Sequence, residues 1–208
     1  MKIYLTRHGE TEWNLTKKMH GHKNANLTEK GVEEAKKLGK SLEDIEFDII
    51  YSSPIERALD TAKHIKGNKT TEIVTEDSLK ELNFGKWEGM FEKDCSEQYP
   101  EQFNNLWYKP ELFEPVEGGE RLQELMKRIE IWFNENIKNS KYENILIVTH
   151  GVVNRAFYTV LKNNPIGRFW EEPYILNTAL TIIEINDNNL EFILEADISH
   201  LKELAKNK

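Results

Sequence analysis

The chain alternates short runs of β-branched and aliphatic residues with longer segments of helical periodicity. This alternation predicts an α/β fold: a three-layer α/β/α sandwich with a mostly parallel sheet. The run Ile145–Thr149 (ILIVT) is apolar on both faces, as expected of a strand that helices cover on both sides. Other strand-like runs occupy residues 3–6, 48–52 and 73–75. Two more, 179–185 and 190–196, flank the turn-rich residues 186–189 and predict a β-hairpin.

Helix signals lie between these runs. A helix is expected after Thr28, and the longest amphipathic pattern begins at Glu120. Ser53, Pro54 and Glu56 combine an N-cap serine, a proline at the first helical position and a glutamate at the third, so a helix is expected to begin at Ser53. Another helix is expected from about Val152.

Residues 84–113 break the alternation. Eight of the 21 aromatic residues of the chain fall there, together with two prolines. Such a density is too apolar for a disordered linker and predicts a cap of short helices, inserted at about residues 84–117. These aromatics could form a small satellite core or an aromatic recognition surface. They could form both if the cap covers a pocket. Lys86, Lys93 and Lys109 could favour substrates with additional acid groups.

Composition narrows the class of protein. The 208 residues carry 28 basic and 36 acidic side chains, a net charge of −8, which argues against nucleic acid or an anionic membrane as partner. The single cysteine, Cys95, permits no intrachain disulfide and fits a reducing compartment. The beginning of the chain does not resemble a signal peptide, and no aliphatic run is long enough to span a membrane. We therefore expect one cytoplasmic domain spanning residues 1–208, of undetermined oligomeric state.

Three residues that are cationic, or can become so, follow predicted strands. His8 follows the first strand, Arg57 lies in the helical turn after the second, and His150 ends the run ILIVT. Ligands of parallel sheets bind outside the carboxyl ends of the strands, so these side chains are expected to converge. Helix N-termini after Ser53 and Gly151 would add backbone N–H groups. Together they predict a site for a phosphoryl group.

Such a site could hydrolyse a phosphate ester. A neutral histidine can attack phosphorus, arginines can bind the phosphoryl oxygens, and a carboxyl group such as Glu81 could protonate the leaving oxygen. Each residue alone also has a structural interpretation. Arg57 could be a solvated residue of a first helical turn, although a cation is unfavourable there unless an anion lies nearby.

Six segments together resemble the histidine phosphatase superfamily, also called the phosphoglycerate mutase-like family. The first, LTRHGETEWN (Leu5–Asn14), is the most specific. The others follow in the family's order: GHKNANLTEKG (Gly21–Gly31), SSPIERALDTA (Ser52–Ala62), LKELNFGKWEG (Leu79–Gly89), EGGE (Glu117–Glu120) and VTHGVV (Val148–Val153). The stretch ELNFGKWEG is similar to the phosphatase branch, which includes broad-specificity and α-ribazole phosphatases.

The resemblance implies a role for each matching residue. His8 would be the nucleophile that becomes phosphohistidine. Arg7 and Arg57 would bind the phosphoryl oxygens with His150 as a further donor, and Asn14 would contact the same group or position His8. No cofactor and no metal are implied.

The same resemblance makes Glu81 the general acid and then the base for the incoming water. The substrate-binding positions would extend to His20, Gly21 and Gly151. The sequence departs from the family pattern here, because members often have glutamine in place of His20 and glycine in place of Val152. Substrate contacts near position 20 are therefore carried over less firmly than the catalytic residues.

Three functions remain open. A metal-independent phosphomonoesterase acting on a small phosphorylated metabolite is favoured. A phosphoglycerate mutase would use the same phosphohistidine, and a non-catalytic phosphate-binding or scaffolding protein would keep the fold without turnover. His20 and His22 together also invite a metal interpretation, which two loop histidines without a nearby cysteine or carboxylate pattern support only weakly.

Overall fold

A single sheet organises the molecule in the computed structural model, which describes residues 1–186 and 189–205. The strands of the sheet are β1 (Lys2–Arg7), β2 (Ile49–Ser52), β3 (Ile73–Thr75), β4 (Asn144–Thr149), β5 (Leu180–Asn186) and β6 (Asn189–Asp197). Their order is β3-β2-β4-β1-β5-β6. The α-helices are α1 (Glu12–Thr16), α2 (Glu29–Ser41), α3 (Glu56–Lys66), α4 (Glu92–Gln98), α5 (Pro100–Tyr108), α6 (Leu122–Asn136) and α7 (Gly151–Leu161).

The sheet is mixed, with a parallel majority as predicted. Strands β3, β2, β4 and β1 run parallel, whereas β5 and β6 form an antiparallel hairpin beside β1. The hairpin pairs Asn186 with Asn189. The two residues between them, Asp187 and Asn188, lie outside the described residues.

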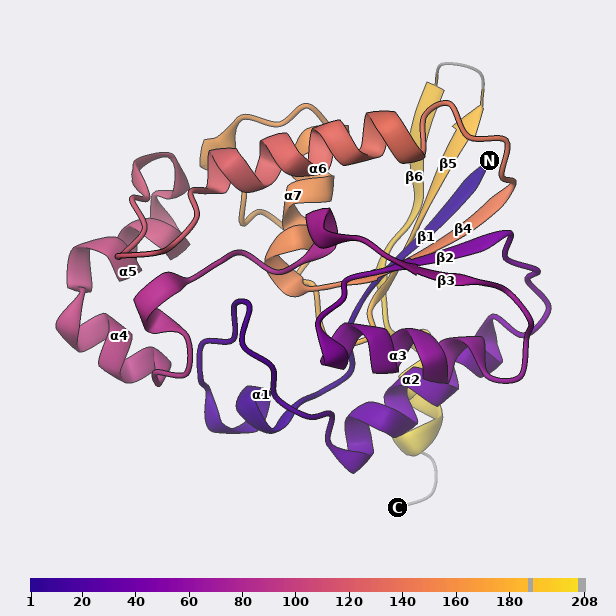
Figure 1. Cartoon of the computed structure of the whole chain (residues 1–208), viewed down its shortest axis with the longest axis horizontal. Helices are drawn as coiled ribbons and strands as arrows, with labels where there is room; N and C mark the ends of the chain where they lie inside the picture. The colour runs from indigo at the N-terminus through magenta and orange to yellow at the C-terminus, as the bar shows by residue number, and fades with distance from the viewer. Residues whose placement is uncertain (187–188, 206–208) are drawn as a thin grey trace.

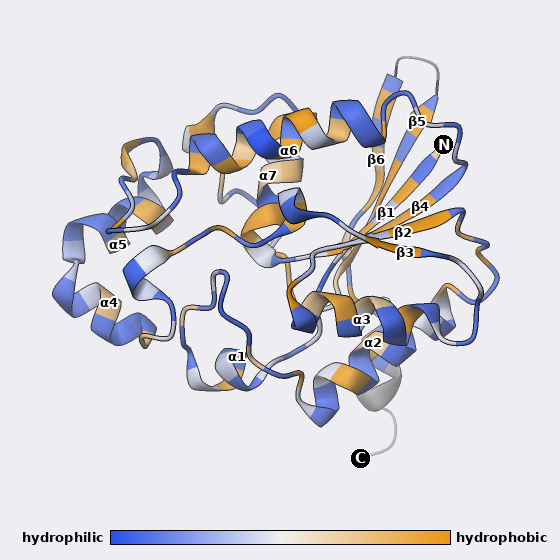
Figure 2. Ribbon diagram, in the orientation of Figure 1, coloured by the Kyte–Doolittle hydropathy of each residue, from blue (hydrophilic) through white to orange (hydrophobic). Residues whose placement is uncertain are grey.

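Helices cover both faces of the sheet, which confirms the three-layer prediction. Figure 1 shows α6 and α7 on one side of the strands and α2 and α3 on the other. Within β4, Leu146 packs in the cluster that contains Leu38 of α2, whereas Ile147 packs in the cluster that contains Trp132 of α6. Both β4 side chains are fully buried. Figure 2 shows the strands as largely apolar and α4, far from them, as largely polar.

The parallel strands bring the predicted site residues to one edge. The His8 N–H donates to the Thr149 carbonyl at 2.9 Å, and the Ser53 N–H donates to the Val148 carbonyl at 3.0 Å. The residues that follow β1 and β2 are thereby attached to the carboxyl end of β4, next to His150. Convergence at this edge follows directly from the parallel pairing.

Helix α3 begins later than predicted. Its N-cap is Ile55, with no side-chain cap, and Ser53 lies two residues before it. The Ser53 hydroxyl accepts a hydrogen bond from the Ile55 N–H at 3.2 Å and pairs with His150 Nε2 at 2.7 Å. The predicted N-cap at Ser53 is therefore wrong, because this side chain is engaged by the site instead of starting the helix.

Residues 84–117, which we call the cap segment, contain α4 and α5 and lie beyond the carboxyl edge of the sheet (Figure 1). Phe84, Trp87, Leu106 and Phe113 are buried in the same apolar cluster as the face of α6 turned to the sheet. The predicted satellite core is wrong, since the core of the cap segment is continuous with the main one. Along the described parts of the chain, no helix has the length and apolarity needed to cross a bilayer.

Candidate active site

His8 lies directly after β1 and is 2% exposed. Its Nδ1 lies 2.8 Å from the Gly9 carbonyl oxygen, which can only accept a hydrogen bond, so Nδ1 carries the proton. The other nitrogen, Nε2, then holds a lone pair whenever the ring is neutral. Burial, followed by the charges of Arg57 and Arg7, holds the pKa of His8 well below its usual value. The imidazole is therefore neutral at physiological pH, and a neutral ring of this kind can attack phosphorus.

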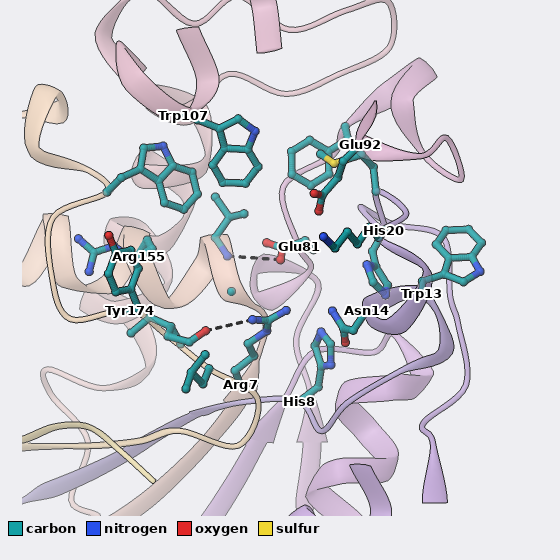
Figure 3. A pocket seen from close by; sticks show the side chains of 18 of the residues that line it. Arg7, His8, Trp13, Asn14, His20, Glu81, Glu92, Trp107, Arg155 and Tyr174 are labelled. Carbon is teal, nitrogen blue, oxygen red and sulfur yellow. Dashed lines mark hydrogen bonds between the residues drawn. The ribbon is translucent and has the colours of Figure 1, made fainter. Parts of the chain in front are cut away.

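Arg7 ends β1 and extends into the same pocket. Its Nη1 donates to the Ile175 carbonyl at 3.0 Å, which fixes the guanidinium against the segment before β5 (Figure 3). A Cβ on Gly151 would lie 3.5 Å from the Arg7 Cζ, an ordinary van der Waals contact, so the start of α7 lies beside this guanidinium. Arg7 Nε is buried and meets no hydrogen-bond acceptor among the described residues.

Arg57, in the first turn of α3, is 1% exposed. Its Nη1 donates to the Lys23 carbonyl and its Nη2 to the Gly21 carbonyl, each at 2.7 Å. The interpretation of Arg57 as a solvated helix residue is therefore wrong. Burial lowers its pKa to about 10, opposed by the charges of Glu81 and Glu88, so the guanidinium stays protonated at neutral pH.

His150 is the N-cap residue of α7 and is fully buried. The centroids of the His150 and His8 rings lie 5.3 Å apart. His150 Nε2 pairs with the Ser53 hydroxyl, and its Nδ1 is buried with no partner in the described part of the chain. Burial and the neighbouring charge of Arg57 hold the pKa of His150 well below its usual value.

Glu81 lies in the pocket wall across from His8 and Arg7 (Figure 3) and is 7% exposed. Its Oε1 accepts from the Leu82 N–H at 2.9 Å and its Oε2 from the Val152 N–H at 3.3 Å. Burial raises the pKa of this carboxyl group, although both N–H groups and both nearby arginines act in the opposite direction. The net effect favours the protonated acid, which can donate a proton.

Asn14 and His20 complete the pocket wall next to His8. Asn14 Oδ1 accepts from the Thr11 N–H and hydroxyl, each at 3.0 Å, and Figure 3 shows its amide nitrogen directed into the pocket. His20 Nε2 pairs with the Thr11 hydroxyl at 2.7 Å. Burial, with the charges of Arg57 and Arg7, lowers the pKa of His20 to about 3.

The two loop histidines contact different residues. His22 Nε2 lies 3.0 Å from the Glu81 carbonyl oxygen, whereas His20 Nε2 pairs with the Thr11 hydroxyl. Within residues 1–186 and 189–205, no three His, Cys, Asp or Glu side chains come together as a metal site requires. Gly21 does not line the pocket, and its carbonyl accepts a hydrogen bond from Arg57. A direct contact of Gly21 with substrate stays a prediction.

A cavity of about 740 Å³ is lined at its inner end by Arg7, His8, Asn14, His20 and Glu81, whereas Arg57 and His150 do not line it. Its outer walls contain residues that the sequence did not single out for function: Trp13, Lys17, Lys18, Glu92, Arg155, Trp170 and Tyr174. Trp107 of the cap segment lines it too, so the cap segment does roof the pocket. The lysines that face it are Lys17 and Lys18 of the loop after α1, not the three lysines considered in the cap segment.

The missed residues carry little sequence signal. Arg155 lies in the apolar helix α7, where a lone charged side chain could have indicated a buried partner. Its Nε and Nη1 donate to the carbonyls of Phe169 and Pro173, which fix the segment that carries the Ile175 carbonyl. Contacts to backbone carbonyls leave no pattern in a sequence.

The arrangement is suited to an oxyanion next to a nucleophile. Arg7 Nε, Arg57 Nε and His150 Nδ1 are buried and have no hydrogen-bond partner among the described residues, and an anion would satisfy the two guanidinium N–H groups. Glu81 is placed on the other side of the pocket, where a leaving group would lie. The geometry therefore supports transfer of a phosphoryl group to His8.

Comparisons with known proteins agree with this geometry. Residues 3–197 match the family model described as histidine phosphatase superfamily, branch 1. Phosphoserine phosphatase 1 of Hydrogenobacter thermophilus is 34% identical over 82% of this chain and 80% of its own. A 2,3-bisphosphoglycerate-dependent phosphoglycerate mutase of Bartonella tribocorum is 33% identical over 77% and 81%. The solved structure of Bacillus stearothermophilus YhfR superposes with a TM-score of 0.92 at 36% identity, covering 96% of this chain and 98% of the other.

Proposed function

The chain belongs to the histidine phosphatase superfamily and is a phosphomonoesterase of that family, and we propose that it hydrolyses small phosphorylated metabolites without a metal through a phosphohistidine on His8. The observation that carries this proposal is the state of His8. Its Nδ1–H is tied to the Gly9 carbonyl, its pKa is lowered, and two arginines flank it. A neutral Nε2 in a cationic pocket is what attack on phosphorus needs.

In the first step, His8 Nε2 attacks phosphorus and forms the N–P bond while the bond from phosphorus to the ester oxygen breaks. Glu81 donates its proton to that leaving oxygen, and an alcohol departs. Arg7, Arg57 and His150 hold the phosphoryl oxygens, at which charge accumulates.

In the second step, water attacks the phosphohistidine and the N–P bond breaks. The Glu81 carboxylate takes one proton from the water, which restores the acid, and inorganic phosphate leaves with the hydroxyl. His8 returns to its neutral state. Asn14 and Gly151, at the start of α7, line the same cavity, and the proposal assigns the Asn14 amide and the Gly151 N–H to the phosphoryl group in both steps.

The proposal is tested by phosphate release in the presence of a chelator and by trapping of labelled phosphoenzyme after a rapid quench. His8→Ala is expected to abolish both signals. His64→Gln is a matched control, because His64 lies on α3 and does not line the pocket. Undiminished turnover of His8→Ala, or wild-type activity that the chelator removes, would refute the mechanism.

A mutase activity is the second candidate, since a phosphoglycerate mutase matches the chain nearly as well as the phosphatase does. A mutase would return the phosphoryl group from His8 to a bound sugar acid instead of to water. The two are separated by following 3-phosphoglycerate. We expect phosphate release to exceed interconversion with 2-phosphoglycerate, and the reverse result would assign the mutase. A non-catalytic phosphate-binding protein would give no phosphoenzyme that turns over.

The outer pocket suggests which alcohols are accepted. A cavity of about 740 Å³ lies within the range of roughly 300–1,000 Å³ that is typical of sites for drug-sized ligands. The Trp107 and Trp170 rings pack together there with centroids 4.7 Å apart, and the exposed Tyr174 faces the same space. These rings favour phosphate esters whose alcohol carries an apolar body, and comparing ethyl with 2-phenylethyl phosphate tests this at nearly equal leaving-group reactivity.

A further inference from the structure

Glu88 follows the short turn Gly85–Trp87 in the cap segment, is half-buried and does not line the pocket. Its carboxylate accepts three backbone hydrogen bonds. Oε1 accepts from the His22 N–H at 2.8 Å and the Phe84 N–H at 3.3 Å, and Oε2 accepts from the Lys23 N–H at 3.2 Å. A single side chain of the cap segment therefore anchors the loop of residues 20–24.

The same loop holds Arg57 through its carbonyl groups. The Gly21 carbonyl accepts from Arg57 Nη2 and the Lys23 carbonyl accepts from Nη1, each at 2.7 Å. The peptide group between Gly21 and His22 is planar, so its C=O faces Arg57 while its N–H faces Glu88. One rigid peptide group thus connects the carboxylate of Glu88 with the guanidinium of Arg57.

Gly21 makes this connection sterically possible. Its φ is +58°, in the left-handed region that favours glycine. A Cβ at this position would lie 2.0 Å from Glu88 Oε1, so any side chain would displace the carboxylate. Close approach of Glu88 to the loop therefore depends on glycine at position 21.

The negative charge of Glu88 also stabilises the protonated form of Arg57. Burial, reinforced by the positive charge of Arg7, lowers the pKa of Arg57 to about 10. The negative charges of Glu81 and Glu88 act in the opposite direction and raise it. Burial raises the pKa of Glu81, and protonation of that carboxyl group would weaken its attraction for Arg57. Glu88 and Glu81 are the two negative charges that act on Arg57, and Glu88 reaches it through the loop of residues 20–24.

We propose that Glu88 is a positioning residue for phosphate binding, which fixes the Arg57 guanidinium through the peptide group between Gly21 and His22. This inference rests on the proposed function of Arg57 as a ligand of the phosphoryl oxygens. With both Nη atoms tied to loop carbonyls, a shift of the loop moves the guanidinium as a whole. A misplacement of about 1 Å in such a group can cost on the order of a hundredfold in rate.

A double-mutant cycle with Arg57 provides the test. Glu88→Gln keeps the shape of the side chain but replaces one acceptor oxygen with an NH₂ group that faces N–H donors. The four proteins are the wild type, Glu88→Gln, Arg57→Gln and the double variant. Binding of inorganic phosphate is measured by calorimetry, which reports on Arg57 whether or not the protein turns over, and kcat and KM are measured on 4-nitrophenyl phosphate.

We expect Glu88→Gln to weaken phosphate binding and to lower kcat/KM by about ten- to a hundredfold, with less than a twofold effect when Arg57 is already replaced. Glu97 is an exposed carboxylate of α4, and Glu97→Gln is the control. This control is expected to change neither phosphate binding nor kcat/KM. An equal loss in both Arg57 backgrounds, or no loss in the single variant, would overturn the proposal. If Glu88→Gln does not fold, Glu88→Asp takes its place, because it keeps the charge and shortens the reach to the loop.

Discussion

Replacing Glu81 by glutamine removes the proposed proton donor while preserving the size of the side chain. The carboxyl group accepts N–H bonds from Leu82 and Val152, and a glutamine oxygen can keep one of them. Its NH₂ group would then face the other N–H, so a modest local adjustment is expected. The arginines, His8 and His150 make no hydrogen bond to this carboxyl group and should stay in place.

The magnitude depends on the leaving group. Proton transfer by a positioned acid typically contributes about 10²–10⁴ in rate. For an alkyl phosphate, whose alkoxide is a poor leaving group, we expect Glu81→Gln to lower kcat by about 10³, roughly 4 kcal/mol of transition-state stabilisation. For 4-nitrophenyl phosphate, whose phenolate leaves without a proton, the first step should slow by less than about tenfold. Single-turnover formation of phosphoenzyme from each ester measures this step.

The pH profile supplies an independent check. Burial raises the pKa of Glu81, so the protonated acid persists above the ordinary carboxyl range and is lost as the pH rises through the raised pKa. The rate with an alkyl phosphate should therefore fall on that basic limb in the wild type and not in Glu81→Gln. Equal losses for alkyl and aryl esters would contradict the role of Glu81, as would an unchanged basic limb in the variant.

Other predictions concern stability and the outer pocket. The pKa of His20 is lowered to about 3 in the folded protein, so folding favours its neutral form. The contribution of His20 to the free energy of unfolding should be full above about pH 6.5 and fall by up to roughly 1.4 kcal/mol per pH unit below it. Urea titrations at several pH values should show a shallower decline for His20→Gln. Gly31→Ala should lower Tm despite the better helix propensity of alanine, because the new Cβ would lie 2.1 Å from the Glu10 carbonyl oxygen; an unchanged or raised Tm would contradict this. Leu125→Ala, in the fully buried face of α6, should cost about 2–5 kcal/mol in urea unfolding. Trp107→Ala should lower kcat/KM for 2-phenylethyl phosphate several-fold and leave ethyl phosphate within about twofold, and equal effects on both would argue against an apolar subsite.

Much of this architecture is encoded locally, and for that reason the sequence predicted it. The run Ile145–Thr149 is apolar at every position up to its end, and only a strand covered on both faces buries all of them. Parallel pairing then brings His8 and His150 to one edge whatever the loops do. Arg57 was predicted at the same edge from its place after the second strand, whereas the role of Arg7 came from the family resemblance and that of Glu81 depended mainly on it, because an isolated glutamate carries almost no signal of its own.

What the sequence could not predict depends on contacts between distant parts of the backbone. The motif at Ser53 satisfies the rules for a helix start, but tertiary structure uses the hydroxyl for His150 and the helix begins at Glu56. The carbonyls of Gly21, Lys23 and Ile175 position two arginines, and a carbonyl is present at every residue. Such contacts become visible only when the loops are placed in space.

The charge of the resting site shows why these parts occur together. Arg7 and Arg57 are protonated at pH 7, the lowered pKa of His8 leaves its ring neutral, and burial raises the pKa of Glu81 above its usual range. The two guanidinium groups next to His8 therefore supply two positive charges, which match the charge of about −1.5 to −2 on a phosphate monoester. A protonated His8 would bind the same anion more tightly but could not attack it, and an ionised Glu81 would repel it. Burial acts on both groups in the useful direction, because it lowers the pKa of the base and raises that of the acid beside two guanidinium groups that stay protonated at neutral pH.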